Sequence, residues 1–143
     1  MSEKTRVLIS CTGNSARSQM AEGLLRKLGE GRYEVSSAGV APSRVRPEAV
    51  EAMREIRIDS SAQRSKSVDE FAGQNFEYII TVCDNANGTC PVFSGCAKRI
   101  HHSFVDPPPA SVGDYDSRLM IFREVRDELK DWLTNFVRER DGG

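Results

Sequence analysis

Cys11 and Arg17, with five residues between them, are the pair whose types and spacing most clearly point to chemistry. They lie between a short apolar run and a helical pattern. Backbone N–H groups of a tight loop, together with the amino end of the following helix, form a binding site for an anion. The Arg17 guanidinium can bind two oxygens of a tetrahedral oxyanion. We therefore predict an oxyanion-binding loop formed by Thr12, Gly13, Asn14, Ser15, Ala16, Arg17 and Ser18.

The same loop is expected to make Cys11 a nucleophile. Its positive field favours the thiolate, so the pKa of Cys11 should lie below the free value of about 8.5. The Ser18 hydroxyl can donate a hydrogen bond to that thiolate, and Gly13 and Asn14 tolerate the backbone angles that the loop needs. The pattern Gly-x4-Gly-Lys-Ser/Thr is absent from this segment, which excludes a nucleotide-binding loop.

Cys83 and Cys90 form a second candidate for chemistry. Cys83 directly follows the strongest strand pattern, Glu77–Val82, and Cys90 comes seven residues later, after a polar, turn-prone segment. Such a segment is easily remodelled, so Cys90 can reach Cys83. The spacing does not suit zinc, and a static disulfide is disfavoured in the cytosol. We interpret the two as a redox pair, with two unrelated core cysteines as the alternative, and Cys96 as a bystander.

Asp106 is the candidate general acid. It follows a weaker strand pattern at Arg99–Phe104, and residues 107–109 are prolines that stiffen the loop presenting it. The alternative is a turn-initiating residue before proline. The two histidines, His101 and His102, are interpreted as strand residues that shape this loop.

Strand patterns alternate with helical patterns along the chain. Such alternation predicts an α/β fold with a parallel sheet, right-handed crossovers and ligands at the carboxyl ends of the strands. The helical pattern that begins at Pro47 is expected to bury Val50, Met53 and Ile56. The strands are predicted at 6–10, 33–37, 77–82 and 99–104, and the helices at 16–28, from Pro47 onward, and over a long segment that contains Phe122 and Phe136.

Length and charge limit the classes of function. The 143 residues make one domain, 1–143, and a net charge of −1 gives no footprint for nucleic acid or an anionic membrane. The apolar run Val7–Ile9 is too short for a signal sequence or a membrane span. We therefore expect a cytoplasmic monomer without nucleic-acid or membrane partners.

The segment from Cys11 to Glu22 resembles the phosphate-binding loop of the low-molecular-weight protein tyrosine phosphatase fold family. Its continuation, Ser18-Gln19-Met20-Ala21-Glu22, is similar to the thioredoxin-coupled arsenate reductase branch. The resemblance spans nearly the whole chain and includes Ser37-Ala38-Gly39, Pro47 with Ala49, Ile58-Asp59 and Phe104-Val105-Asp106-Pro107. It implies a three-layer α/β fold, in which a four-stranded parallel sheet is flanked by helices and the active site lies at the first loop.

The resemblance implies reduction of arsenate to arsenite through a covalent Cys11 adduct and a thiol–disulfide relay among Cys11, Cys83 and Cys90. Arsenate and other tetrahedral oxyanions would be ligands, and thioredoxin or a similar thiol donor would supply the electrons without another cofactor. Two alternatives remain open, a tyrosine phosphatase and a non-catalytic oxyanion-binding or redox-sensing module. The phosphatase is disfavoured because Pro108, Pro109 and Ala110 replace the aromatic residues that would stack on phosphotyrosine.

Relatives in this branch can hold a potassium ion with residues that match Asn14, Glu22 and Ser37, together with an aspartate at the position of Lys66. A lysine cannot ligate a cation, but its ammonium can supply the positive charge as a donor of three hydrogen bonds. We therefore expect no metal here, and we expect Lys66 to support the loop by bracing Asn14 and Glu22.

Overall fold

Four parallel strands form one sheet, with the strand that carries Cys11 in its interior. The computed structural model describes residues 4–11, 16–39, 43–71, 74–82 and 98–142, and every structural statement below refers to these residues. The strand order is β2-β1-β3-β4, and all three pairings are parallel. The strands are β1 (Thr5–Cys11), β2 (Tyr33–Gly39), β3 (Tyr78–Thr81) and β4 (Lys98–His101). The predicted parallel sheet is confirmed.

Strand β1 is buried on both faces because it has a neighbour on each side and a layer of side chains above and below. Val7, Leu8 and Ile9 have no exposed surface, which explains the continuous apolar run in the sequence. The strand extends one residue beyond the predicted end, and Cys11 pairs with Gly39 of β2. Pairing with β2 therefore holds the backbone of Cys11 at the starting point of the predicted loop.

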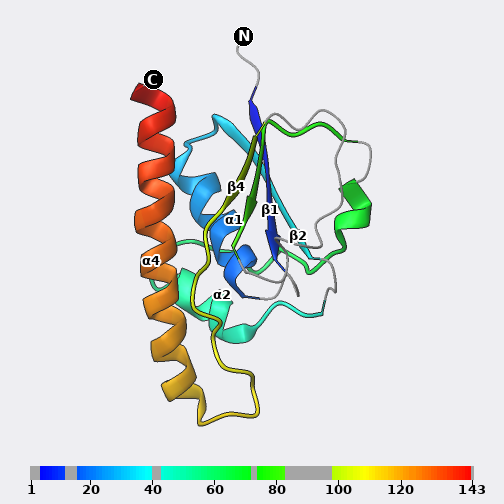
Figure 1. Ribbon diagram of the computed structural model, residues 1–143. Coiled ribbons are helices and arrows are strands. Elements are labelled where there is room, and N and C mark those ends of the chain that lie inside the picture. The colour runs from blue at the N-terminus through cyan, green and yellow to red at the C-terminus, as the bar shows by residue number, and fades with distance from the viewer. Residues whose placement is uncertain (1–3, 12–15, 40–42, 72–73, 83–97, 143) are drawn as a thin grey trace.

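The helices lie on one face of the sheet, as Figure 1 shows for α1 and α4. Helix α4 buries the apolar stripe that the sequence indicates, from Phe122 to Phe136. None of the helices in the described ranges is long and apolar enough to cross a membrane. The helices are α1 (Arg17–Leu28), α2 (Pro47–Arg54) and α4 (Tyr115–Gly142).

The inner face of α2 differs from the prediction. Its fully buried apolar side chains are Ala49, Ala52 and Met53, whereas Val50 is only half-buried and Ile56 lies beyond the end of the helix. Met53 was correctly assigned, and Ile56 is partly buried and packs against the core from just beyond the end of the helix, so Val50 is the residue that was wrongly assigned. Glu48 lies beside the buried stripe, and its carboxylate is turned inward, where two arginines bind it.

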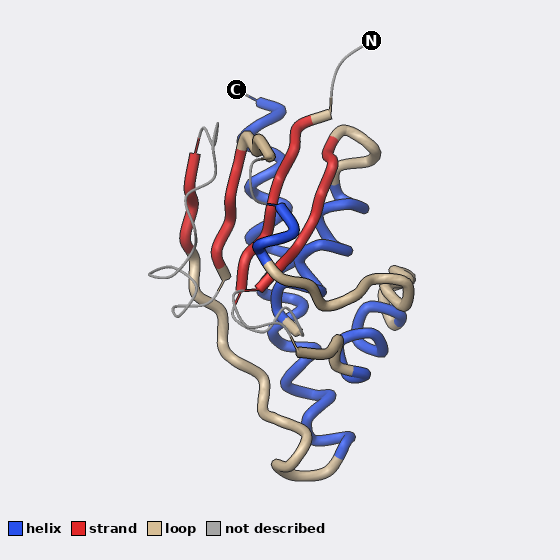
Figure 2. Tube along the Cα trace, turned by 90° about the vertical axis from the view of Figure 1, so that its right-hand side faces the viewer, coloured by secondary structure: helices blue, strands red, loops and turns tan. Residues whose placement is uncertain are grey.

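The opposite face of the sheet is covered by a 3₁₀ helix, η1 (Val68–Phe71), which the sequence analysis did not predict. Figure 2 shows η1 crossing in front of the strands, with the longer helices behind them. Val68 and Phe76 pack with Leu8 and Ile79 into a second apolar cluster on this face. Three layers therefore exist, but in the described part of the chain the second covering layer is thin.

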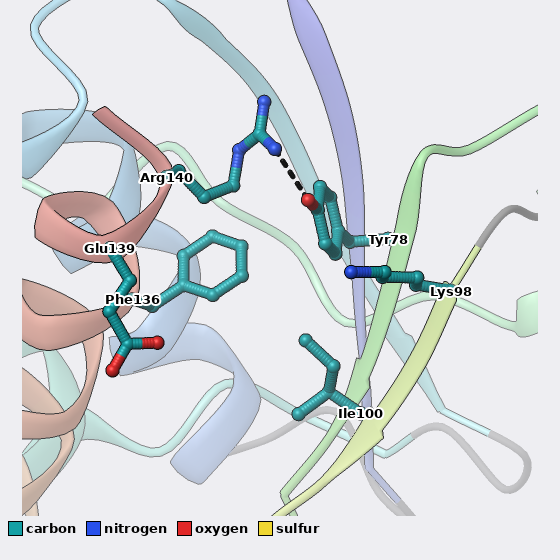
Figure 3. A pocket seen from close by; sticks show the side chains of 6 residues that line it. All are labelled: Tyr78, Lys98, Ile100, Phe136, Glu139 and Arg140. Atoms are coloured by element: carbon teal, nitrogen blue, oxygen red, sulfur yellow. Dashed lines mark hydrogen bonds between the residues drawn. The ribbon is translucent and has the colours of Figure 1, made fainter. Parts of the chain in front are cut away.

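Helix α4 is fastened to the amino end of the sheet by its last turns. Arg140 Nη1 donates a hydrogen bond of 2.5 Å to the hydroxyl of Tyr78, beside the ring of Phe136 (Figure 3). The Tyr78 and Phe136 rings meet edge to face, with centroids 5.2 Å apart. These contacts lie at the end of the sheet away from Cys11, so they hold the fold together rather than contribute to the predicted site.

Glu48 connects α2 to the start of α4. Its buried Oε2 accepts hydrogen bonds from Arg46 Nη2 at 2.9 Å and from Arg118 Nε at 2.7 Å. Arg118 Nη1 also donates to the carbonyls of Val112 and Gly113, at 3.2 and 2.7 Å. This cluster therefore holds the segment that runs from Asp106 into α4.

Replacing Glu48 by glutamine should lower the free energy of unfolding by about 2 kcal/mol at pH 7, because two partly buried arginines lose a charged acceptor. Burial alone would raise the pKa of Glu48, but hydrogen bonds from Arg118 and Arg46 outweigh it and lower the pKa below its ordinary 4.5. The folded state therefore binds fewer protons than the unfolded state. The stabilisation is present above pH 4.5 and is lost as the pH falls through the lowered pKa.

Urea unfolding of wild type and Glu48→Gln between pH 3 and pH 7 measures this effect. Glu51→Gln, on the same helix but partly exposed, is the matched control and should change stability by less than about 0.5 kcal/mol. A difference between wild type and Glu48→Gln that is as large at pH 3 as at pH 7 would contradict the electrostatic explanation.

Candidate active site

The first strand, the first helix and the segment after β4 meet around Arg17. Cys11 ends β1 and is 4% exposed, and α1 begins six residues later at Arg17. The predicted loop residues Thr12, Gly13, Asn14 and Ser15 lie outside the described residues. What the structure places is therefore the two ends of the loop, a buried cysteine at the carboxyl end of an interior strand and a helix start beyond it.

The residues at the amino end of α1 favour binding of an anion there. Its first turn contains no acidic residue, and Ala16, which precedes it, has no side chain that could cap the backbone N–H groups. Met20 N donates to the Ala16 carbonyl at 2.9 Å, which begins the helical hydrogen bonding. Ser18 is fully buried in this turn. The positive end of the helix dipole therefore has no counter-charge within its own first turn.

Arg17 reaches across to the segment after β4. Its Nη1 donates a hydrogen bond of 3.1 Å to the Phe104 carbonyl, and its Nη2 lies 3.2 Å from Asp106 Oδ1. The Arg17 side chain is 13% exposed, whereas that of Asp106 is 77% exposed. One nitrogen of the Arg17 guanidinium thus binds the Phe104 carbonyl, which orients the side chain, and the other faces the candidate general acid at the surface.

Asp106 is held at the mouth of the site by its neighbours in the chain. Phe104 and Pro107 are buried on either side, and Phe104 N donates to the Val82 carbonyl at 3.2 Å. This arrangement presents an accessible carboxyl beside a guanidinium. A group so placed can exchange protons with solvent and transfer one to an oxygen that Arg17 binds.

Glu22 forms a buried cluster behind the start of α1. Its Oε1 accepts a hydrogen bond of 2.5 Å from Ser37 Oγ, and its Oε2 accepts one of 2.6 Å from Arg26 Nη2. The Lys66 ammonium lies 3.7 Å from Glu22 Oε1 and donates to the Arg64 carbonyl at 3.1 Å. Three of the four predicted support residues, Glu22, Ser37 and Lys66, are therefore together, while the fourth, Asn14, lies outside the described residues.

The donor set around Glu22 does not fit a metal cation. Two positive side chains, Arg26 and Lys66, already face the single carboxylate, and a cation would be repelled by both. Burial lowers the pKa of Lys66, and the attraction of the Glu22 carboxylate opposes that shift. The Lys66 side chain is only 11% exposed, so it is not a solvated surface residue. The described residues thus place a lysine ammonium beside the Glu22 carboxylate.

The sequence analysis missed the contacts that fix Lys66. Gly39 N, on the strand that pairs with Cys11, donates to the Lys66 carbonyl at 2.9 Å. The Gln19 side chain donates to the Arg64 carbonyl at 3.0 Å, and Gln63 donates to Gln19. Of the missed residues, only Arg26 had a local signal, since it lies four residues after Glu22 on one helical face.

Cys83, Cys90 and Cys96 lie outside the described residues, but the residue before Cys83 is placed. Val82 N donates a hydrogen bond of 3.1 Å to the carbonyl of Ser10, the residue before Cys11. The backbone positions that directly precede the two cysteines are therefore neighbours on adjacent parallel strands. His101 belongs to β4, where its Nδ1 shares a hydrogen bond of 2.6 Å with Thr81 Oγ1.

Comparisons with known proteins agree with this geometry. The sequence pattern of the family described as "Low molecular weight phosphotyrosine protein phosphatase" matches residues 6–141. The "Arsenate reductase" of Halalkalibacterium halodurans is 39% identical over 134 residues, which cover 94% of this chain and 96% of that protein.

Two solved structures extend the likeness to three dimensions. "An arsenate reductase in the phosphate binding state" superposes with a TM-score of 0.80 at 32% identity, and "An arsenate reductase in oxidized state" with 0.71 at 31%. Each comparison covers 94% of this chain and 98% of the other. The similarity therefore covers nearly the whole of both chains.

Proposed function

This chain belongs to the low-molecular-weight phosphotyrosine protein phosphatase family, and we propose that it acts there as an arsenate reductase. The observation that carries the proposal is the hydrogen bond between Val82 N and the Ser10 carbonyl. A phosphatase needs only Cys11, Arg17 and Asp106, whereas reduction needs a second thiol that can reach the first. The bond brings the strand that leads into Cys83 beside the strand that ends at Cys11.

In the first step, the Cys11 thiolate attacks the arsenic of arsenate. The amino end of α1 and the Arg17 guanidinium offset the charge of the oxyanion. A sulfur–arsenic bond forms, one arsenic–oxygen bond breaks, and Asp106 gives its proton to the departing oxygen, which leaves as water. The likeness to a structure named for its phosphate-binding state supports an anion site here.

In the second step, arsenic is reduced. The Cys83 thiolate attacks the Cys11 sulfur, a disulfide forms, and the electron pair of the sulfur–arsenic bond passes to arsenic, which leaves as arsenite. Cys90 then attacks Cys83, which moves the disulfide to Cys83–Cys90 and returns Cys11 as a thiol. Each exchange is the attack of a thiolate on sulfur. The net reaction converts one arsenate and two thiols into arsenite, a disulfide and water.

A dithiol protein of the thioredoxin type would then reduce the Cys83–Cys90 disulfide, so the relay requires no metal or organic cofactor. This need for a reducing partner suits a cytoplasmic location. Because phosphate has the charge and shape of arsenate, slow hydrolysis of phosphate esters should accompany the main reaction.

Formation of arsenite from arsenate, in the presence of thioredoxin, thioredoxin reductase and NADPH, tests the proposal. We expect steady turnover that requires Cys11, Cys83 and Cys90. The tyrosine phosphatase alternative predicts no turnover of arsenate, with release of phosphate from a phosphotyrosine peptide that survives replacement of Cys83 and Cys90. A chain that binds oxyanions but performs neither reaction would be a binding or sensing module.

We propose further that Lys66 supplies the positive charge that potassium supplies in relatives. Exchanging potassium for sodium at constant ionic strength should therefore change neither Tm nor arsenate turnover of the wild type. Lys66→Asp replaces the ammonium by a second carboxylate, which can ligate a cation together with Glu22. The Tm of this variant should then be about 3 °C higher in potassium than in sodium. Thermal unfolding in KCl and NaCl measures both. A potassium-specific rise in wild type would contradict the role of Lys66.

A further inference from the structure

A pocket beside the candidate active site has an aromatic floor and an acidic rim. It lies between α4 and the segment that follows β4, and its volume is about 440 Å³. Trp132, Phe104 and His102 contribute the rings, Glu128 and Asp131 contribute carboxylates, and Val105 contributes an apolar edge. None of the described residues that line it is a lysine or arginine.

The rings form one connected surface. The centroid of His102 lies 4.7 Å from that of Phe104 and 5.5 Å from that of Trp132. Phe104 is buried beneath them, Trp132 is half-buried, and His102 is exposed. An indole face attracts a cation through its quadrupole, most strongly when water is partly excluded. Glu128 and Asp131, exposed one turn and one residue before Trp132 on α4, add negative charge at the same mouth.

Aromatic rings beside carboxylates favour a positively charged ligand with an apolar or planar stem. A basic side chain can lay its aliphatic or planar stem on the rings and direct its charge to the carboxylates. An anion would be repelled by both carboxylates, and a purely apolar group would leave them unpaired. The pocket therefore suits the end of a lysine or arginine side chain.

The pocket also borders the carboxyl end of the sheet, where the candidate active site lies. His102 N donates to the Thr81 carbonyl at 3.0 Å, and Phe104 N donates to the Val82 carbonyl at 3.2 Å. Val82 directly precedes Cys83, and the Phe104 carbonyl accepts from Arg17. Val105, between Phe104 and Asp106, is 61% exposed, a large apolar side chain facing outward next to the site. A protein that reached a thiol at this edge would cover these residues.

We propose that this pocket is a docking site for the protein that supplies reducing thiols, and that it takes up a basic side chain of that protein. The proposal rests on the arsenate reductase function proposed above. Val105 provides the apolar contact, Trp132 the cation–π contact, and Glu128 and Asp131 the charge complementarity that steers the partner to this face. The pocket thus acts in recognition of the reductant and not in the chemistry at Cys11.

The test compares two reductants. Dithiothreitol is too small to contact the pocket and the site together, whereas thioredoxin covers a surface. In Glu128→Gln/Asp131→Asn, the ratio of thioredoxin-dependent to dithiothreitol-dependent kcat/KM for the reductant should fall about 10-fold at low salt, from the loss of two charge pairings and of the steering they provide. Added salt should lower the wild-type ratio towards that of the variant.

Glu30→Gln/Glu77→Gln is the matched control. It removes the same charge from two exposed glutamates at the amino end of the sheet, and its ratio should equal that of wild type. An unchanged ratio in the pocket variant, or an equal fall in the control, would overturn the docking proposal. If neither reductant supports arsenite formation by wild type, it is the proposed function that fails.

A second copy of this chain is the other occupant that the test must detect. Sedimentation velocity of wild type and of Glu128→Gln/Asp131→Asn across a 100-fold range of concentration should show the same species for both. A wild-type dimer that the substitutions dissociate would assign the pocket to self-association and overturn the proposal.

Discussion

Replacing Cys90 by serine is expected to stop the enzyme after about one turnover, with Cys11 and Cys83 joined in a disulfide. Cys83 can still attack the Cys11 sulfur and release arsenite, but no third thiol then resolves the disulfide. Quantifying arsenite per enzyme in a rapid-quench experiment measures the burst. Peptide mapping by mass spectrometry without reduction identifies the linked cysteines.

Cys96→Ser is the matched control for this prediction. It removes a thiol six residues further along the same segment, and turnover should stay within about twofold of wild type. Sustained turnover of Cys90→Ser with thioredoxin would exclude Cys90 as the resolving thiol. A large loss in Cys96→Ser would assign that role to Cys96.

Replacing Asp106 by asparagine should lower the rate of the first chemical step by about 10²–10⁴-fold, the usual contribution of a positioned proton donor. Asparagine has nearly the same shape, and its carbonyl oxygen can still accept from Arg17, which Asp106 Oδ1 faces at 3.2 Å. The loss should therefore fall on the rate of the step and not on the affinity for arsenate. Single-turnover formation of arsenite, measured as a function of arsenate concentration, separates the two.

The alternative role for Asp106 is to position Arg17. In that case asparagine would weaken arsenate binding, seen as a higher half-saturating concentration, while the limiting single-turnover rate stayed within a few-fold of wild type. Asp106→Glu distinguishes the roles further, because it keeps an ionisable carboxyl and should recover part of the rate. Equal rates for Asp106→Asn and wild type would reduce Asp106 to a turn residue.

Local patterns in the sequence were sufficient to predict the parallel sheet and the position of Cys11 at the carboxyl end of its first strand. A buried parallel strand is a continuous apolar run, so β1 and β3 were predicted to within two residues at each end. Strand β4 ends at His101 instead of Phe104, although the backbone N–H groups of residues 102 and 104 still donate to the Thr81 and Val82 carbonyls. On α2 the buried stripe includes Ala49 and Ala52 in place of the predicted Val50, because two alanines without strong hydrophobic signal share the helical face of Met53.

The sequence by itself determined the alternation of strands and helices and the position of Cys11 at the junction of a strand and a helix, since these depend on neighbours along the chain. Only the tertiary structure decided that Arg17 meets Asp106, that Lys66 faces Glu22 and that Val82 lies beside Ser10. These pairs are separated by 44 to 89 residues, and strand order and crossover geometry bring them together. Side-chain types and spacing contain no direct information on such contacts, because a contact depends on where two elements pack and not on what either prefers alone.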